Sequence, residues 1–415
     1  ASQVPTMRWE AEWNLIDALR KEGQTETAYL RIREIFDSTD RAEIIDPLIQ
    51  LRYLWLEALL AFDSERFEEV EQVTEEILDS LATAETLDLS AEALDTITAR
   101  TLLLSSQSYL KKAAAEYFGS SVGESARRGF ERIDELERRF PEHDVTLQAL
   151  FEKARFLRER GMAVDAQNIY LSIFEKNENS PYAPIALYEA AINAANLIAL
   201  ENPESLNIRE SEPIRLLTQL TENYQQDGQL FFYARLKQGD IARDLGQFGV
   251  AQSLYEEVIK QFPEHPQRYL PEMGRADAIL AQASNDPSRY GEAIVAFERL
   301  VERPGVPLDL KAEAGYKWAF ALEGQGNTDR SQAIHNLVRS RFLLNRKSAS
   351  QLGETGRYWI SRSLLKSAQL FELSGDLRSA RKLYQDIIDS GLPGQSLAAA
   401  QLSRLGVANE IAGIR

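Results

Sequence analysis

Apolar residues recur along this chain at spacings of three and four, the period of a helix that is buried on one face. The clearest case follows Gly246, where Ala251 and Tyr255 lie at helical intervals and Phe262-Pro263 ends the segment. Proline cannot continue a helix, so the Phe-Pro pair marks a helix end. The pattern predicts amphipathic helices joined by short turns.

The same frame of a glycine, a small residue and a larger apolar residue returns elsewhere in the chain. Three further copies are Gly23, Ala28, Ile32 and Ile35; Gly161, Ala166, Tyr170 and Ile173; and Gly375, Leu377, Ala380, Tyr384 and Ile387. Weaker copies keep only the second-helix positions, namely Phe67, Val70, Thr74 and Ile77; Ala126, Phe130 and Ile133; Tyr290, Ala293, Phe297 and Leu300; and Ala333 with Leu337.

Each copy predicts a helix pair. Glycine permits the tight turn, the small residue lets two helices approach, and the larger residue fills the groove between them. One pair alone leaves an apolar face bare, and stacking the pairs covers it. The sequence therefore predicts an array that runs from end to end.

These residues resemble the tetratricopeptide repeat (TPR) family, most completely near residues 148–181 and 229–266. The resemblance implies an all-α fold, a right-handed superhelical solenoid of about eight or nine TPR-like antiparallel helix pairs, with residues 1–415 as a single array. The Phe-Pro endings and Asn179-Ser180-Pro181 further resemble bacterial envelope-associated TPR scaffold proteins. That likeness implies a periplasmic or cell-envelope location and a membrane-associated complex, while a cytoplasmic location stays open.

The chain also departs from the family. Its small-residue positions are on average about 44 residues apart, against about 34 in such repeats, so the helices are longer or the loops contain insertions. Residues 200–213 carry two prolines and mixed charges and are the best place for a joint between two superhelical segments. Residues 391–415 contain a short helix rich in Ala and Leu, which we expect to cap the last pair.

Composition narrows the range of partners. The formal charge is −17, and an acidic field repels phosphate backbones, so we expect no nucleic acid. There is no cysteine, and no apolar stretch reaches the roughly 20 residues that cross a bilayer, so we expect no transmembrane segment. The chain begins at Ala1, which favours an exported, processed form.

Catalytic patterns are lacking in the sequence. His143, His265 and His335 form no cluster with metal-ligand spacing, and the first two occupy matching turns between repeats. No phosphate-binding loop and no nucleophile elbow is present. We therefore expect no enzyme, no metal and no cofactor.

The first helices of the clearest repeats carry basic and aromatic residues at the positions that face the ligand in the family, as the resemblance implies. Arginine and lysine among aromatic side chains suit a peptide or protein segment that carries carboxylates. The predicted peptide-binding residues of the concave face are Phe151, Arg155, Arg158, Tyr233, Lys237, Arg243, Arg362, Lys366 and Gln369.

Three interpretations stay open. The first is a non-catalytic protein-interaction scaffold in a cell-envelope complex. The second is a helical protein that captures a small molecule or glycan, which requires exposed, clustered tryptophans. The third, a helical-toroid enzyme, would need converging carboxylates that the sequence does not show. The basic residues could equally be solvated faces of amphipathic helices.

Overall fold

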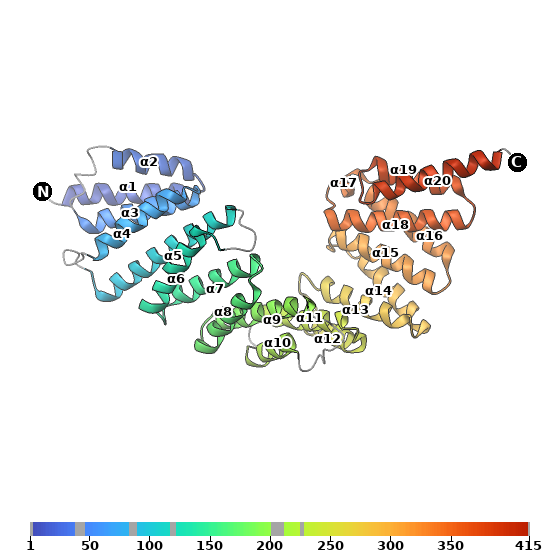
Figure 1. Ribbon diagram of the computed structural model, residues 1–415, viewed down its shortest axis with the longest axis horizontal. Helices are drawn as coiled ribbons and strands as arrows, with labels where there is room; N and C mark the ends of the chain where they lie inside the picture. The colour runs from blue at the N-terminus through green and yellow to red at the C-terminus, as the bar shows by residue number, and fades with distance from the viewer. Residues whose placement is uncertain are drawn as a thin grey trace. The chain divides into compact units, whose positions relative to one another are not determined.

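The computed structural model describes residues 3–37, 46–82, 89–116, 122–200, 211–224 and 228–413. Within these ranges the chain forms 20 α-helices and no strand (Figure 1), which confirms the predicted all-α helical solenoid. The chain divides into two compact units, residues 1–202 and 203–415. Residues 201–210, most of the stretch in which we expected a joint, lie outside the described residues.

The first unit stacks its helices in chain order (Figure 1). Four successive pairs, α1 with α2 through α7 with α8, are followed by α9. The helices are α1 (Gln3–Lys21), α2 (Thr25–Asp37), α3 (Pro47–Asp63), α4 (Phe67–Ala82), α5 (Ala91–Ala115), α6 (Glu124–Arg139), α7 (Asp144–Glu159), α8 (Ala163–Lys176) and α9 (Ala183–Leu200).

The second unit begins with α10 and continues with four pairs, α11 with α12, α13 with α14, α15 with α16, and α18 with α19. A π-helical turn and the short α17 interrupt the series after α16. The helices are α10 (Glu212–Asn223), α11 (Gly228–Asp244), α12 (Phe248–Gln261), α13 (Tyr269–Ala283), α14 (Tyr290–Glu302), α15 (Leu308–Gly324), α16 (Thr328–Val338), α17 (Arg346–Ala349), α18 (Glu354–Leu373), α19 (Leu377–Asp389) and α20 (Gln395–Gly413).

The turn within a pair is set by glycine in a left-handed conformation. Gly161 and Gly246 have φ of 78° and 75°, a region that side chains with a Cβ rarely adopt. The residue five positions later is the small residue of the second helix, and Ala166 and Ala251 are both fully buried. The glycine therefore fixes which face of the second helix enters the core.

The larger residue four positions after the small one fills the groove between neighbouring first helices. Tyr255 on α12 is fully buried, and its ring lies against Gly239 of α11 and Gly274 of α13. A Cβ on either glycine would come within 2.6 Å or 2.4 Å of the ring. The same pair of positions is buried as Ala28 and Ile32, Ala166 and Tyr170, Ala293 and Phe297, and Ala380 and Tyr384.

The predicted register of α16 is wrong by two residues. Ala333 is exposed and Leu337 is only half-buried, whereas Ser331 and His335 are buried. Gly326 has a positive φ of 81° and is the turn glycine of this pair. Five residues after it, Ser331 occupies the small-residue position, and four residues later His335 occupies the ring position. Ser331 and His335 are polar, so they did not fit the apolar pattern from which the register was predicted.

At the end of the chain, α20 packs against α19, with Ala398 and Leu405 buried. Arg381 on α19 donates a hydrogen bond to the Leu405 carbonyl oxygen at 2.7 Å. Most of the predicted capping segment, residues 391–415, is thus a helix that covers the last pair on one side, and residues 414–415 lie outside the described ranges.

Candidate binding surfaces

In the first unit, the predicted residues lie on α7. The Phe151 ring packs on Tyr170 with centroids 5.4 Å apart, and Arg158 forms an ion pair with Glu189 of α9. Arg155 is free to reach outward, because its side chain is 58% exposed and its nearest carboxylate, Glu159, is 3.9 Å away. Of the three, Arg155 is the residue whose charged group, the guanidinium, is accessible to a ligand.

Arg155 lines a cavity of about 270 Å³ between the first helices of three successive pairs. The lining comes from the end of α3, the second half of α5 and α7, so the cavity lies on the face that first helices form. Its members are Phe62, Gln107, Leu110, Lys111, Ala114, Glu152, Arg155, Phe156 and Glu159.

In the second unit, α11 carries Tyr233, Lys237 and Arg243. The Tyr233 hydroxyl donates to Gln267 Oε1 at 2.5 Å, which ties α11 to the turn before α13. Arg243 lies 3.0 Å from Asp244 and 3.5 Å from Asp240. Arg243 is therefore matched by two carboxylates, while Lys237 lies half-buried on the same helix.

Asp240 belongs to the core as well as to this surface. It accepts a hydrogen bond from the Tyr255 hydroxyl at 2.7 Å. Burial raises the pKa of Asp240, against the lowering effects of that hydrogen bond and of Arg243. The acidic residue that interrupts the basic series on α11 is thus a partner of the buried tyrosine.

The predicted Arg362 belongs to a cluster of aromatic side chains on α15 and α18. Its guanidinium lies 5.7 Å from the centre of the Tyr316 ring and 5.9 Å from that of Tyr358, and it donates hydrogen bonds to both hydroxyls at 3.4 Å and 3.3 Å. Trp359 contacts both tyrosine rings, with centroids 5.3 Å and 5.2 Å apart. We call these four residues the Arg362 cluster.

The Arg362 cluster is only partly covered. Tyr358 is 42% exposed, Arg362 is exposed, and Phe320, one helical turn along α15 from Tyr316, is 46% exposed. A core would bury such rings. Tyrosine, tryptophan and arginine are the residue types enriched where proteins bind other proteins.

One turn further along α18, the predicted Lys366 joins a partly buried polar network. Its ammonium lies 3.0 Å from Glu323 of α15. Glu323 also lies 3.7 Å from His335 Nε2, and His335 Nδ1 is 2.7 Å from the Ser363 hydroxyl. Burial lowers the pKa of His335, and Glu323 opposes that shift. The predicted Gln369 is exposed at the next turn.

The predicted residues of the first unit therefore lie on α7, and those of the second unit lie in two places, on α11 and α18. In the second unit, α13 and α15 stand between the last two, and there Asp277 and Lys317 form an ion pair at 2.7 Å. Burial raises the pKa of Asp277, and Lys317 opposes this. Within the second unit, the predicted residues of α11 and α18 thus form two surfaces.

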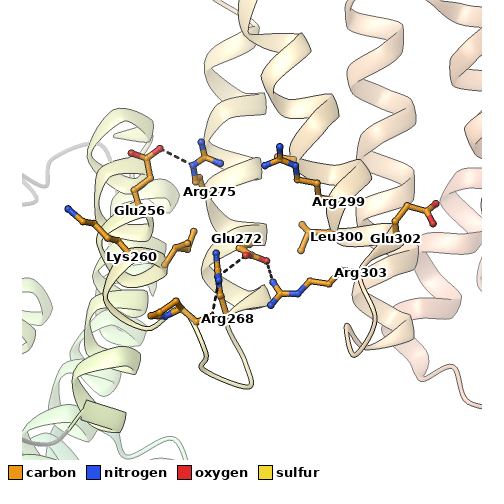
Figure 2. Close-up of a pocket in the computed structure, with 12 residues that line it drawn as sticks. Glu256, Lys260, Arg268, Glu272, Arg275, Arg299, Leu300, Glu302 and Arg303 are labelled. Carbon is orange, nitrogen blue, oxygen red and sulfur yellow. Dashed lines mark hydrogen bonds and ion pairs between the residues drawn. The ribbon is translucent and has the colours of Figure 1, made fainter.

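A cavity larger than the one around Arg155 involves none of the predicted residues. It has a volume of about 890 Å³ and lies between the second helices α12 and α14, over the first half of α13 (Figure 2). It is lined by Glu256, Ile259, Lys260, Pro263, Arg268, Glu272, Arg275, Ala296, Arg299, Leu300, Glu302 and Arg303. We call it the α12–α14 cleft. The sequence signal for this cleft was weak, because the five cations that line it alternate with acidic residues over three helices.

The tryptophans divide between core and surface. Trp9 and Trp318 are buried, as expected of packing residues, whereas Trp13, Trp55 and Trp359 are half-buried. Trp13 and Trp55 line a small cavity of about 190 Å³ in the first unit, together with Leu48, Leu51, Arg52, Ile97 and Arg100.

Two of the histidines have structural contacts. His143 and His265 each accept a backbone N–H at 3.2 Å through Nδ1, in the matching turns that follow Phe-Pro. His265 also stacks on Phe232, with ring centroids 3.7 Å apart. No group of three or more His, Asp or Glu in the described ranges is arranged to hold a metal ion, and no helix there is long and apolar enough to cross a membrane.

Comparison with known proteins identifies the repeat. Residues 233–265, most of α11 and α12, match the family model described as tetratricopeptide repeat, which confirms the predicted repeat type. No curated protein matches the chain significantly.

Several solved structures are similar. A tetratricopeptide repeat protein from Parabacteroides merdae is 12% identical, with 74% of this chain and 98% of that chain covered and a TM-score of 0.43. The quorum sensor NprR from B. thuringiensis is 12% identical, with 80% and 86% covered and a TM-score of 0.40. Yeast Tom70 is 11% identical, with 98% and 97% covered and a TM-score of 0.38. With TM-scores below 0.5, these likenesses support no conclusion of their own.

Proposed function

We propose that this tetratricopeptide-repeat protein is a non-catalytic scaffold that binds a segment of another protein along the face formed by its first helices. The observation that carries the proposal is the Arg362 cluster, in which Tyr316 and Tyr358 flank an exposed guanidinium and Trp359 packs against both tyrosine rings. Rigid rings beside a cation give a partner apolar area and charge-assisted hydrogen bonds at small entropic cost.

The surface around Arg155 supports the same function in the first unit. Its cavity combines Phe62 and Phe156 with Lys111 and Arg155, so it also pairs apolar surface with positive charge. An extended or helical segment with acidic and apolar side chains suits both surfaces. Arg158, Arg243 and Lys366 are matched by carboxylates, so we assign them to the scaffold more than to the ligand.

Site-specific photocrosslinking tests this function. A photoreactive phenylalanine analogue at Tyr358, in the intact protein inside its source cells, should crosslink to a defined partner protein. The matched control places the same analogue at Val250, which is 47% exposed in the first turn of α12. Arg362→Glu should abolish the crosslink, whereas Arg330→Glu, on an exposed residue of α16, should not.

The proposal fails if Tyr358 gives no partner-specific product, or if Arg362→Glu leaves that product unchanged. A product that appears equally from Val250 would place the partner elsewhere on the surface. These outcomes separate binding at the first helices from binding through the charged exterior.

We further propose a location in the bacterial cell envelope, as part of a membrane-associated complex. The support is the likeness of the Phe-Pro repeat endings to those of envelope-associated scaffolds. Fractionation of the source cells with an antibody to the protein tests the location, and recovery with the cytoplasmic proteins alone would refute it.

We propose no nucleic-acid partner, because the −17 charge disfavours one.

A second candidate function, capture of a small molecule or glycan, draws on the cavity between Trp13 and Trp55. Arg52 lies 4.5 Å over the Trp13 ring, so one face of that ring already has a cation on it. The volume of about 190 Å³ is smaller than the roughly 300–1,000 Å³ of usual ligand sites. A fluorescence titration with glycans and small aromatic compounds tests it, and a signal that survives Trp13→Ala and Trp55→Ala would exclude this cavity.

A further inference from the structure

The α12–α14 cleft is a second surface, distinct from the first-helix face. Its walls are the second helices of two successive pairs, and its floor is the half of α13 that follows the turn at residues 263–268 (Figure 2). Ligands of the first helices would approach α13 near Asp277, which contacts Lys317 of α15. Glu272 and Arg275 of α13 line the cleft, whereas Asp277 and Lys317 do not.

Two ion-pair groups account for part of the charge in the cleft. Glu272 on the floor contacts Arg268 at 2.9 Å and Arg303 at 2.6 Å. Glu256 contacts Arg275 at 2.8 Å, and Arg275 also lies 3.2 Å from Glu292. The arginines are therefore held in place before any ligand arrives, which reduces the entropy that binding must cost.

Two cations remain unmatched. Lys260 on α12 and Arg299 on α14 are exposed, and neither has an acidic partner in the part of the chain that the structure describes. They come from opposite walls (Figure 2). The third acidic lining residue, Glu302, pairs with Arg341 outside the cleft at 2.6 Å. The cleft thus holds five cations against two inward carboxylates.

The floor and walls also offer apolar surface. Ile259, Pro263, Ala296 and Leu300 contribute to the lining between the charged groups. A volume of about 890 Å³ is within the range of ligand sites and is far larger than a single inorganic anion needs. The ligand that fits has carboxylates at two separated points and an aliphatic side chain between them.

The net charge of the chain is unevenly placed. Residues 1–202 carry 21 Lys and Arg against 38 Asp and Glu, whereas residues 203–415 carry 26 of each. The acidic excess therefore belongs to the first unit, and screening over about 8 Å at physiological salt limits its effect on charges elsewhere. A short acidic segment can approach this cleft, whereas a continuous phosphate backbone would meet the carboxylates of Glu256 and Glu272 along it.

We propose that the α12–α14 cleft binds a short acidic segment of a partner protein, with Lys260 and Arg299 each contacting one carboxylate and an aliphatic side chain of the ligand resting on Ile259 and Leu300. This site is independent of the first-helix surface. A scaffold with both could hold one protein segment at α15 and α18 and a second at the α12–α14 cleft of the same unit.

The test uses the full chain and an array of acetylated, amidated peptides. Each peptide carries two Asp or Glu residues, two to six positions apart, around a central Leu, and each has a counterpart with Asn and Gln. Wild type should bind a subset of the acidic peptides and none of the amide counterparts, measured by fluorescence anisotropy. The double variant Lys260→Glu and Arg299→Glu should bind that subset at least tenfold more weakly, because each lost charge-assisted contact is worth about tenfold.

The matched control is Arg330→Glu with Lys347→Glu, which changes the net charge equally at two exposed residues of the second unit outside the cleft. It should bind like wild type. Arg362→Glu should also bind like wild type, so that failure at the first-helix surface is distinguished from failure here.

Several results would overturn the proposal. They are equal binding of acidic and amide peptides, equal binding by wild type and the Lys260 and Arg299 variant, and equal weakening by the control. Displacement of the peptide by millimolar inorganic phosphate would indicate a small-anion site. Tighter, cleft-dependent binding of oligo-dT would indicate nucleic acid.

Discussion

Replacing Gly274 with alanine tests the packing that defines the repeats. An added Cβ would lie 2.4 Å from Tyr255 Cζ and 2.7 Å from Cε1. The ring has no room to move away, because it is fully buried and α11 also approaches it closely at Gly239, where an added Cβ would lie 2.6 Å from Cε1. Overpacking of this kind costs about 1–3 kcal/mol, and alanine returns up to about 1 kcal/mol of helix propensity.

We therefore expect Gly274→Ala to lower the free energy of unfolding by about 1–2 kcal/mol. For a unit of this size, that corresponds to a fall in Tm of roughly 2–8 °C. The assay is thermal and urea unfolding followed by circular dichroism. The matched control is Gly249→Ala in the same repeat, where nothing lies within 4 Å of the added Cβ, and which should unfold no earlier than wild type.

A double-mutant cycle assigns the cost to the ring. In a Tyr255→Leu background, itself less stable, the added methyl meets a shorter side chain, so Gly274→Ala should cost much less there. Two results would refute the reasoning: an unchanged Tm for Gly274→Ala, or the same loss in both backgrounds.

Two further predictions concern the core. Ala251→Leu puts three extra carbons at a fully buried contact between helices and should cost about 1–3 kcal/mol, measured by urea unfolding; full stability would contradict the assigned repeat register. His335 faces Glu323, Lys366 and the Tyr316 ring, and burial lowers its pKa. Its contribution to stability is therefore complete above the unfolded pKa of about 6.5 and is lost as pH falls below that value. His335→Phe should remove that loss between pH 7 and 5, as followed by tryptophan fluorescence in urea, and an identical pH profile would refute the assignment.

The repeat core could be predicted because its signal is local. A glycine turn, a small residue five positions later and a ring four further on lie within one helix, so Ala251 and Tyr255 are visible in the sequence alone. The register of α16 failed because Ser331 and His335 are polar, and their burial depends on Glu323 and Ser363 from other helices. Counting five and nine residues from the turn glycine Gly326 would have assigned Ser331 and His335 to the core positions.

The surfaces were harder to predict, because stacking rather than sequence spacing brings their residues together. Arg362 was predicted, yet Tyr316, which contacts it, and Trp359, which packs against Tyr316, were not. The two residues lie on different helices and meet only when α15 packs against α18. Lys260 and Arg299 are similarly separated along the chain, and each alone resembles an ordinary solvated cation.

The close contact of Tyr255 with two glycines limits how the repeats can be exchanged. Seven residues before each turn glycine, the first helix carries Gly239 in this repeat but Ala154, Ala319 or Ala368 in others. Two of those alanines, Ala154 and Ala368, belong to repeats whose ring position is also a buried tyrosine, so a tyrosine by itself does not require glycine on its own first helix. This repeat differs in that glycines of both α11 and α13 approach the ring, so a transplanted α12 would keep that close contact only if Gly239 and Gly274 were moved with it.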